Sequence, residues 1–106
     1  MNMEEMLAQA QKAAETIQKQ MGDAQAKLDE IEVEGTAGGR AVVVVMTCAK
    51  EVRAVTFSDE VLEQVDKDEL EEMTLLAMRD AVGQAERISK EELSAVTGGL
   101  NLPGLM

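Results

Sequence analysis

The stretch "IEVEGTAGGRAVVVVMT", residues 31–47, decides the fold. Ile31 and Val33 alternate with acidic residues, which is typical of a strand with one apolar face. The pair Gly38 and Gly39 then predicts a hairpin turn that requires positive φ angles. The following run, AVVVVM, is apolar at consecutive positions, so we expect a strand with both faces covered. The stretch therefore predicts an antiparallel hairpin whose second strand lies in the core.

A third strand, Val52–Phe57, follows a short connection. Alternation predicts that Val55 and Phe57 lie on one of its faces and Val52 and Ala54 on the other. Three strands in chain order form an antiparallel meander. Because two helices can cover only one face of this sheet, the other apolar face predicts a homodimer formed through the sheet. The candidate dimer-interface residues are Val42, Val43, Val44, Val45 and Phe57.

A long helix precedes the sheet and runs from about Met3 to Asp29. Apolar residues recur along it at alternating steps of four and three, which we call the heptad seam. The heptad seam consists of Met3, Leu7, Ala10, Ala14, Ile17, Met21, Ala24, Leu28 and Ile31. The helix would be about 40 Å long, whereas a compact domain of this size has a radius of gyration of about 13 Å. Part of the seam should therefore overhang the domain, either packed on a partner subunit or lining an open arm.

A second long amphipathic helix is expected after the strands. Asp66 can cap its N-terminus, with Glu69 in the capping-box position. The helix should end near Val96, because the glycine pair that begins at Gly98 favours a left-handed stop. The order of elements predicts an α+β fold with a single domain over residues 1–97.

The chain ends with "TGGLNLPGLM", residues 97–106. Leu100, Leu102 and Leu105 lie among glycines and a proline that prevent a helix. These leucines either dock in the dimer or bind a separate partner. We expect a flexible C-terminal tail over residues 98–106, with an unidentified protein as its candidate partner.

Composition limits the chemistry that is available. The chain has 106 residues, no His and one Cys, which argues against histidine-based catalysis, metal sites and a disulfide framework and fits a reducing cytoplasm. The longest apolar run is too short to span a bilayer. Twenty-one acidic and ten basic residues give a net charge of −11, and the run "SDEVLEQVDKDELEE" is typical of a solvated helix face. We expect no enzymatic activity, no cofactor, no metal and no membrane contact.

Local positive charge decides whether such an acidic chain can contact nucleic acid. Lys12, Lys19 and Lys27 are seven and eight residues apart and form a stripe on the outer side of the first helix. Such a stripe is also typical of a solvated helix face, and no aromatic residue is placed to stack on bases. With a sparser set on the last helix, the candidate DNA-binding residues are Lys12, Lys19, Lys27, Arg79, Arg87 and Lys90.

Three segments resemble one bacterial family. "EIEVEGTAGG", "EVRAVTF" and "TGGLNLPGL" are similar to the YbaB/EbfC family of nucleoid-associated proteins, and the resemblance covers nearly the whole chain. It implies a homodimer whose helices project like the arms of tweezers. It also implies binding to double-stranded DNA in the nucleoid, a change in DNA conformation, and effects on nucleoid organisation and gene expression.

Two departures from the family pattern affect these expectations. Residues 48–51 replace the Asn-Gly or Gly-rich turn of many relatives, and the acidic second half predicts weak, salt-sensitive and non-specific DNA binding. Two functions remain open at this point. One is an architectural DNA-binding dimer, and the other is a dimeric protein-interaction scaffold that uses the helical arms and the apolar tail without significant DNA binding.

Overall fold

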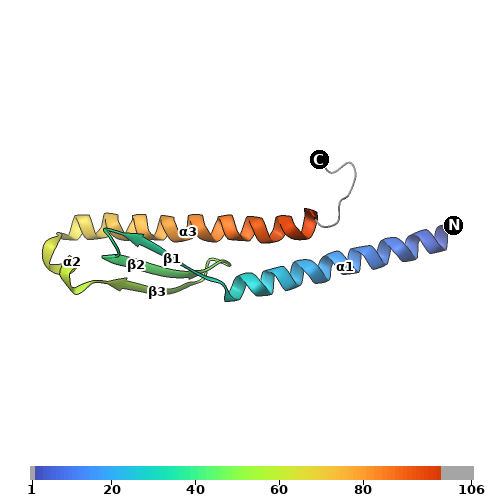
Figure 1. The fold of residues 1–106 in the computed structure, drawn as a ribbon, viewed down its shortest axis with the longest axis horizontal. Helices are drawn as coiled ribbons and strands as arrows, with labels where there is room; N and C mark the ends of the chain where they lie inside the picture. Colours follow the sequence, from blue (N-terminus) through green and yellow to red (C-terminus); the bar gives the residue numbers. More distant parts are fainter. Residues whose placement is uncertain (1, 99–106) are drawn as a thin grey trace.

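A computed structural model describes residues 2–98, and it confirms the α+β fold (Figure 1). The three strands form one antiparallel sheet in the order β1-β2-β3. The elements are α1 (Met3–Glu30), β1 (Glu32–Ala37), β2 (Val42–Thr47), β3 (Val52–Phe57), α2 (Asp59–Gln64) and α3 (Lys67–Gly98). Except for Gly98, which is the last residue of α3, the expected tail lies outside the described residues, and its flexibility stays a prediction.

The core lies between α3 and one face of the sheet (Figure 1). Val42 and Val44 of β2 have no exposed surface, and neither do Ala77, Ala81 and Ala85 of α3. The three alanines recur at every fourth position, so they form one line along the helix. A line of small side chains lets the helix axis come close to the strands.

Gly35 of β1 makes the closest approach between the sheet and α3. A Cβ atom at this position would overlap the backbone carbonyl oxygen of Ala77 and the backbone nitrogen of Ala81. It would also lie 2.7 Å from the Cβ atom of Ala81. Because backbone atoms cannot move aside as a flexible side chain can, any side chain at position 35 would push α3 away from β1.

Both hairpin turns contain residues with positive φ. Gly38 and Gly39 have φ angles of 62° and 63°, which confirms the predicted first turn. The second turn contains Lys50 at φ 69°. There the Thr47 carbonyl oxygen accepts a hydrogen bond from the Lys50 nitrogen at 2.8 Å, and the Thr47 hydroxyl oxygen accepts one from the Glu51 nitrogen at 3.1 Å. The threonine therefore supports a turn that contains no glycine.

A β-bulge changes the predicted faces of β3. The register pairs Ala54 with Val45 and Val52 with Met46, so Arg53 is an extra residue. Residues that pair directly project to the same face, and Met46 lies on the face covered by α3. The prediction that Val52 shares a face with Ala54 is therefore wrong, because it assumed strict alternation.

Only one face of β2 is fully covered within the chain. Val42, Val44 and Met46 are buried under α3, whereas Val43 and Val45 on the opposite face are half-buried. We expected both faces of this strand to be covered, and the chain itself fully covers one of them. The other face is only partly closed.

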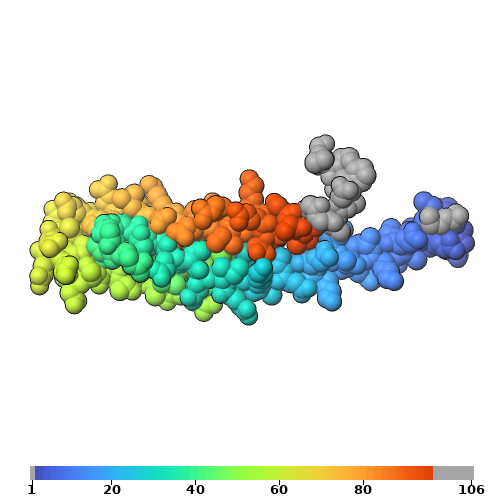
Figure 2. Space-filling model, in the orientation of Figure 1, coloured from blue at the N-terminus to red at the C-terminus, as the bar shows by residue number. Residues whose placement is uncertain are grey.

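The N-terminal part of α1 projects from the domain, and we call residues 3–20 the arm (Figure 2). The heptad seam is buried at Ala24 and Leu28, where α1 meets α3, but Leu7 is 59% exposed and Met3 is 77% exposed. The molecule measures 74 × 24 × 17 Å, and its radius of gyration is 20.8 Å. The prediction that part of the seam overhangs the domain is confirmed.

Side chains cap the helices where polar residues precede them. The Asp66 carboxylate accepts a hydrogen bond from the Glu69 nitrogen at 2.9 Å, which confirms the predicted start of α3. The helix continues to Gly98, two residues beyond the predicted end near Val96. Ser58 caps the short helix α2, which lies within the acidic run and was not predicted as a separate element.

Candidate nucleic-acid interface

The ten basic side chains divide into paired and unpaired sets. Four form ion pairs with carboxylates: Lys27–Glu92 at 3.1 Å, Arg40–Glu34 at 2.8 Å, Lys50–Glu86 at 3.1 Å and Lys67–Glu71 at 3.3 Å. Within residues 2–98 the other six form no ion pair, and they are Lys12, Lys19, Arg53, Arg79, Arg87 and Lys90. Five of the six predicted DNA-binding residues therefore belong to the unpaired set.

Lys12 and Lys19 lie on the arm. They are two helical turns apart, which separates them by about 10 Å along the axis, and both are exposed. Glu15 lies one turn from each of them, but no ion pair joins it to either lysine. The third predicted lysine, Lys27, has its Nζ bound to Glu92 of α3, so it fastens the base of the arm to the domain.

Arg79, Arg87 and Lys90 lie on the outward surface of α3. They are exposed and fall within an arc of about 80° on the side of the helix away from the buried alanines. The two acidic residues between Arg79 and Lys90 are both engaged. Asp80 binds the Thr36 nitrogen, and Glu86 pairs with Lys50. On this surface the three basic side chains are exposed and form no ion pair among the described residues, although the chain as a whole is acidic.

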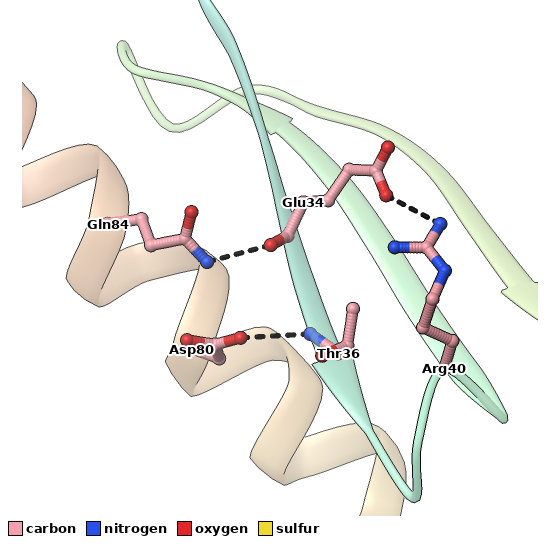
Figure 3. Close-up of polar contacts among 5 residues, drawn as sticks. All are labelled: Glu34, Thr36, Arg40, Asp80 and Gln84. Atoms are coloured by element: carbon pink, nitrogen blue, oxygen red, sulfur yellow. Dashed lines mark hydrogen bonds and ion pairs between the residues drawn. The ribbon is translucent and has the colours of Figure 1, made fainter.

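Polar side chains of α3 close the free edge of β1 (Figure 3). The Asp80 Oδ2 accepts a hydrogen bond from the Thr36 nitrogen at 3.0 Å, and the Gln84 Nε2 donates one to the Glu34 carbonyl oxygen at 2.7 Å. The carboxylate of Glu34 is held by Arg40 at 2.8 Å. Since unpaired backbone groups on an edge strand would accept another strand, these contacts protect the edge.

The β3 side of the sheet is open. Val52, Val55 and Phe57 are 45%, 41% and 38% exposed, although the register places them on the face that carries α3. The side of α3 that faces β3 is also apolar. The polar side chains Asp80 and Gln84 lie on the other side of the helix, where they contact β1. We call the combined surface the open flank, and it consists of Val52, Val55 and Phe57 of β3 with Leu75, Met78 and Val82 of α3.

The predicted dimer-interface residues lie in three different parts of the structure. Val42 and Val44 have no exposed surface and belong to the protomer's own core, so they cannot contact a partner directly. Val43 and Val45 are half-buried on the face opposite α3. Phe57 lies on the open flank. Val52 was not among the predicted interface residues, because the bulge that turns it to this face leaves no signal in the alternation of the sequence.

Cys48 is a free cysteine whose side chain is buried. Burial raises the pKa of the Cys48 thiol, and the nearby carboxylate of Glu92 raises it further. Residues 2–98 contain no cluster of three or more Cys, Asp or Glu side chains arranged to hold a metal ion. None of the helices in this range is long and apolar enough to cross a bilayer.

Comparisons with known proteins agree with this architecture. Residues 1–100 match the YbaB/EbfC DNA-binding family. A nucleoid-associated protein of Afipia carboxidovorans is 39% identical over 94 residues, which cover 89% of this chain and 90% of that protein. Nucleoid-associated proteins of Alkaliphilus metalliredigens and Clostridium kluyveri are 39% and 38% identical over 104 residues, with 98% of this chain and 88% of each relative covered.

A solved structure shows the same fold. The crystal structure of an uncharacterized protein from Helicobacter pylori superposes with a TM-score of 0.71 at 20% sequence identity, and it covers 86% of this chain and 91% of that chain. The fold, the match along nearly the whole sequence and the identity to nucleoid-associated proteins lead to one conclusion. The chain belongs to the YbaB/EbfC DNA-binding family.

Proposed function

We propose that the protein acts as a homodimer that binds double-stranded DNA in the bacterial cytoplasm and alters its conformation, with a role in nucleoid organisation and gene regulation. One observation carries this proposal. Five unpaired basic side chains lie on the outward surfaces of α1 and α3, while the acidic residues between those on α3 are held by partners within the chain. The domain over residues 1–97 supplies both surfaces.

The basic residues suit the phosphate backbone better than base edges. Lys12 and Lys19 are about 10 Å apart along α1, and Arg79 and Lys90 are about 16 Å apart along α3. Such spacings place charges at separated phosphates of one duplex, and phosphate contacts position a protein without reading sequence. Arg79 and Arg87 can each make a bidentate contact with a phosphate group. We therefore expect little sequence preference.

The open flank supports dimerisation. A partner on the β1 edge would have to displace Asp80 and Gln84, whereas a partner on the β3 side would cover Val52, Val55 and Phe57 without breaking any hydrogen bond described above. Burial of exposed apolar surface on association is favourable. A homodimer built on the open flank would carry two arms and two copies of each basic set.

Two separated sets of phosphate contacts can change the path of the DNA between them. Smooth bending of a site of 20–30 base pairs by 40–90° costs of the order of 1–6 kcal/mol, and contacts made only on the bent duplex offset that cost. The net charge of −11 per chain opposes the approach of DNA and keeps binding weak. Each phosphate contact adds about −0.9 to the slope of log K against log[salt].

Fluorescence anisotropy with a random-sequence duplex, titrated at low and moderate salt, tests the proposal. The double variant Lys12→Gln, Lys19→Gln and the triple variant Arg79→Gln, Arg87→Gln, Lys90→Gln should each weaken binding and flatten the salt slope. Lys67→Gln is the matched control, because it removes one positive charge that is paired with Glu71 at the acidic end of α3. No binding by the unmodified protein at low salt would overturn the proposal and favour the scaffold function instead.

A further inference from the structure

The uncovered apolar face of the arm begins where α3 ends. The two helices run side by side in opposite directions, and α1 continues beyond the end of α3 (Figure 1). Near the end of α3 they enclose an open hollow, which is lined by Gln20 and Ala24 of α1 and by Ala95 and Val96 of α3. Because α3 ends at Gly98, the chain leaves this helix next to the hollow and close to the arm.

The heptad seam of the arm faces the side on which α3 lies. Ala24 and Leu28, which are buried where α1 meets the domain, mark this face. A heptad seam drifts by only about 20° per heptad around a straight helix, so its exposed part points to nearly the same side. Ile17 is half-buried and Leu7 is exposed, so cover is lost as α1 runs beyond α3 (Figure 2). From Ile17 to Met3 the seam is an apolar line of about 21 Å that no other element covers within residues 2–98.

The tail, residues 98–106, matches this line in chemistry and length. It contains three leucines and no charged side chain. The eight residues after Gly98 span about 26 Å in extended form, which exceeds the length of the uncovered seam. Glycine and proline prevent a helix, which is why composition predicts a flexible tail, but they are compatible with an extended segment. In such a segment Leu100 and Leu102 project to the same side.

We propose that the tail lies along the exposed seam of its own arm as an extended apolar strap. At about 3.3 Å per extended residue, Leu102 reaches about 13 Å beyond Gly98. At 1.5 Å per helical residue, Ala14 and Ala10 lie about 9 and 15 Å beyond Gln20. The middle leucine should therefore cover these two alanines, whose small side chains leave room for it.

The chemistry beside the seam suits a neutral extended segment. In the heptad register the flanking positions e and g carry no charge from Met6 to Gln25. They offer no complement to a charged partner, whereas the amides of Gln11 and Gln18 can donate and accept hydrogen bonds along an extended backbone. A tethered segment also meets the seam at an effective concentration in the millimolar range, which a separate molecule must reach in solution. These features favour the tail of the same chain as the occupant.

The strap does not depend on the proposed DNA contact or on the proposed dimer. Lys12 and Lys19 occupy position f, which is farthest from the seam, so both stay exposed when the seam is covered. The open flank consists of residues of β3 and α3 and includes no part of the arm. Each arm would carry its own strap, so the arms of a dimer would remain separate.

Cysteine cross-linking in the full chain tests the strap. The double variant Ala10→Cys, Leu102→Cys places one thiol on the seam and one on the tail. The matched control Ala8→Cys, Leu102→Cys moves the first thiol to position b, which is exposed but turned away from the seam. Native Cys48 is 2% exposed and is common to both variants. Under mild oxidation, the seam variant should form a disulfide within one chain at least about tenfold faster than the control.

The products of oxidation distinguish the possible occupants of the seam. Equal rates in the two variants would show that the tail is undocked in the isolated protein, which would overturn the proposal and favour the unidentified protein partner. Fast disulfides between two chains, at a rate that rises with protein concentration, would place the tail on another copy and would overturn the proposal as well.

Hydrogen exchange provides a second measurement without added thiols. The triple variant Leu100→Ser, Leu102→Ser, Leu105→Ser should exchange its arm amides about threefold faster or more, while exchange in β2 stays unchanged. Asn101→Ser is the matched control, because it changes a polar residue of the same tail. Unchanged exchange in the arm of the triple variant would contradict the strap. Anisotropy with duplex DNA on this variant, which keeps all basic residues, reports on the proposed function separately.

Discussion

The two edges of the sheet differ in whether side chains of α3 cover them. At the β1 edge, Asp80 and Gln84 of α3 bind backbone groups of Thr36 and Glu34, and Gly35 lets the helix backbone approach the strand. At the β3 edge no side chain of α3 takes that role among the described residues, and apolar residues stay exposed. One helix thus closes one edge and leaves the other open. We therefore expect stability and the proposed assembly to depend on different residues.

The largest expected effect comes from filling the closed edge. Gly35→Ala should lower the free energy of unfolding by about 3 kcal/mol or more, because the added Cβ meets the backbone of α3 rather than a movable side chain. Urea denaturation measures the change. Gly83→Ala on α3 is the control, since nothing lies within 4 Å of its Cβ position, and it should stabilise the helix by up to about 1 kcal/mol. Equal stability of the two variants would contradict the close approach.

A charge on the open edge should act on assembly instead of folding. Val55→Asp adds a carboxylate to the open flank, and desolvating it in an interface costs about 1–3 kcal/mol or more. Sedimentation should therefore show a shift from dimer to monomer, while the protomer stays folded by circular dichroism. Thr56→Asp, which adds the same charge to the other face of β3, should keep the dimer. Loss of the dimer in Thr56→Asp alone would move the interface to the face of Val43 and Val45.

Removing the polar closure should give a smaller, local effect. Asp80→Ala leaves the Thr36 nitrogen without its partner, which should cost about 1–2 kcal/mol. Hydrogen exchange at the Thr36 amide should become faster, whereas exchange in β2 should change only as much as global stability does. Arg79→Ala, at the next position but on the outward surface, is the control. Unchanged exchange at Thr36 would show that the hydrogen bond does not protect this edge.

The smallest effect is expected at the ion pair beside the closed edge. Arg40 and Glu34 are both substantially exposed, and surface ion pairs contribute about 0–1 kcal/mol. Arg40→Gln should change the melting temperature very little, and 0.5 M salt should remove any difference from the unmodified protein. A loss as large as that of Asp80→Ala would mean that Arg40 positions Glu34 for the contact between its carbonyl oxygen and Gln84.

Local patterns in the sequence predicted the elements well. The glycine pair at Gly38, the cap at Asp66 and the heptad seam each act over a few residues, and the structure confirms all three. The difference between the two edges was not predicted, because it depends on contacts between distant residues. Asp80 lies 44 residues from Thr36. The faces of β3 were missed for a related reason, since a bulge depends on the partner strand.

The sequence predicted where the candidate DNA-binding residues lie, but not which of them form ion pairs. Spacing placed Lys12, Lys19 and Lys27 on one stripe, yet it could not show that Lys27 pairs with Glu92 while the other two have no ion pair. The hydrogen bond of Asp80 to Thr36 and the ion pair of Glu86 with Lys50 also require the folded chain. Composition gives the net charge, whereas which cations form ion pairs can be seen only in the folded chain.

The shape of α1 has a mechanical consequence. The arm is rooted by the packing of Ala24 and Leu28 and by the ion pair Lys27–Glu92, and residues 3–20 extend beyond these contacts. With a length of about 27 Å, the arm acts as a lever, and a rotation of about 10° at the root moves its tip by about 5 Å. That displacement is comparable to the rise of one to two base pairs, about 3.4 Å each along a strand. In the proposed DNA contact, we expect rotations of this size to let Lys12 and Lys19 follow phosphates whose spacing varies with DNA sequence, and so to add to the tolerance of sequence.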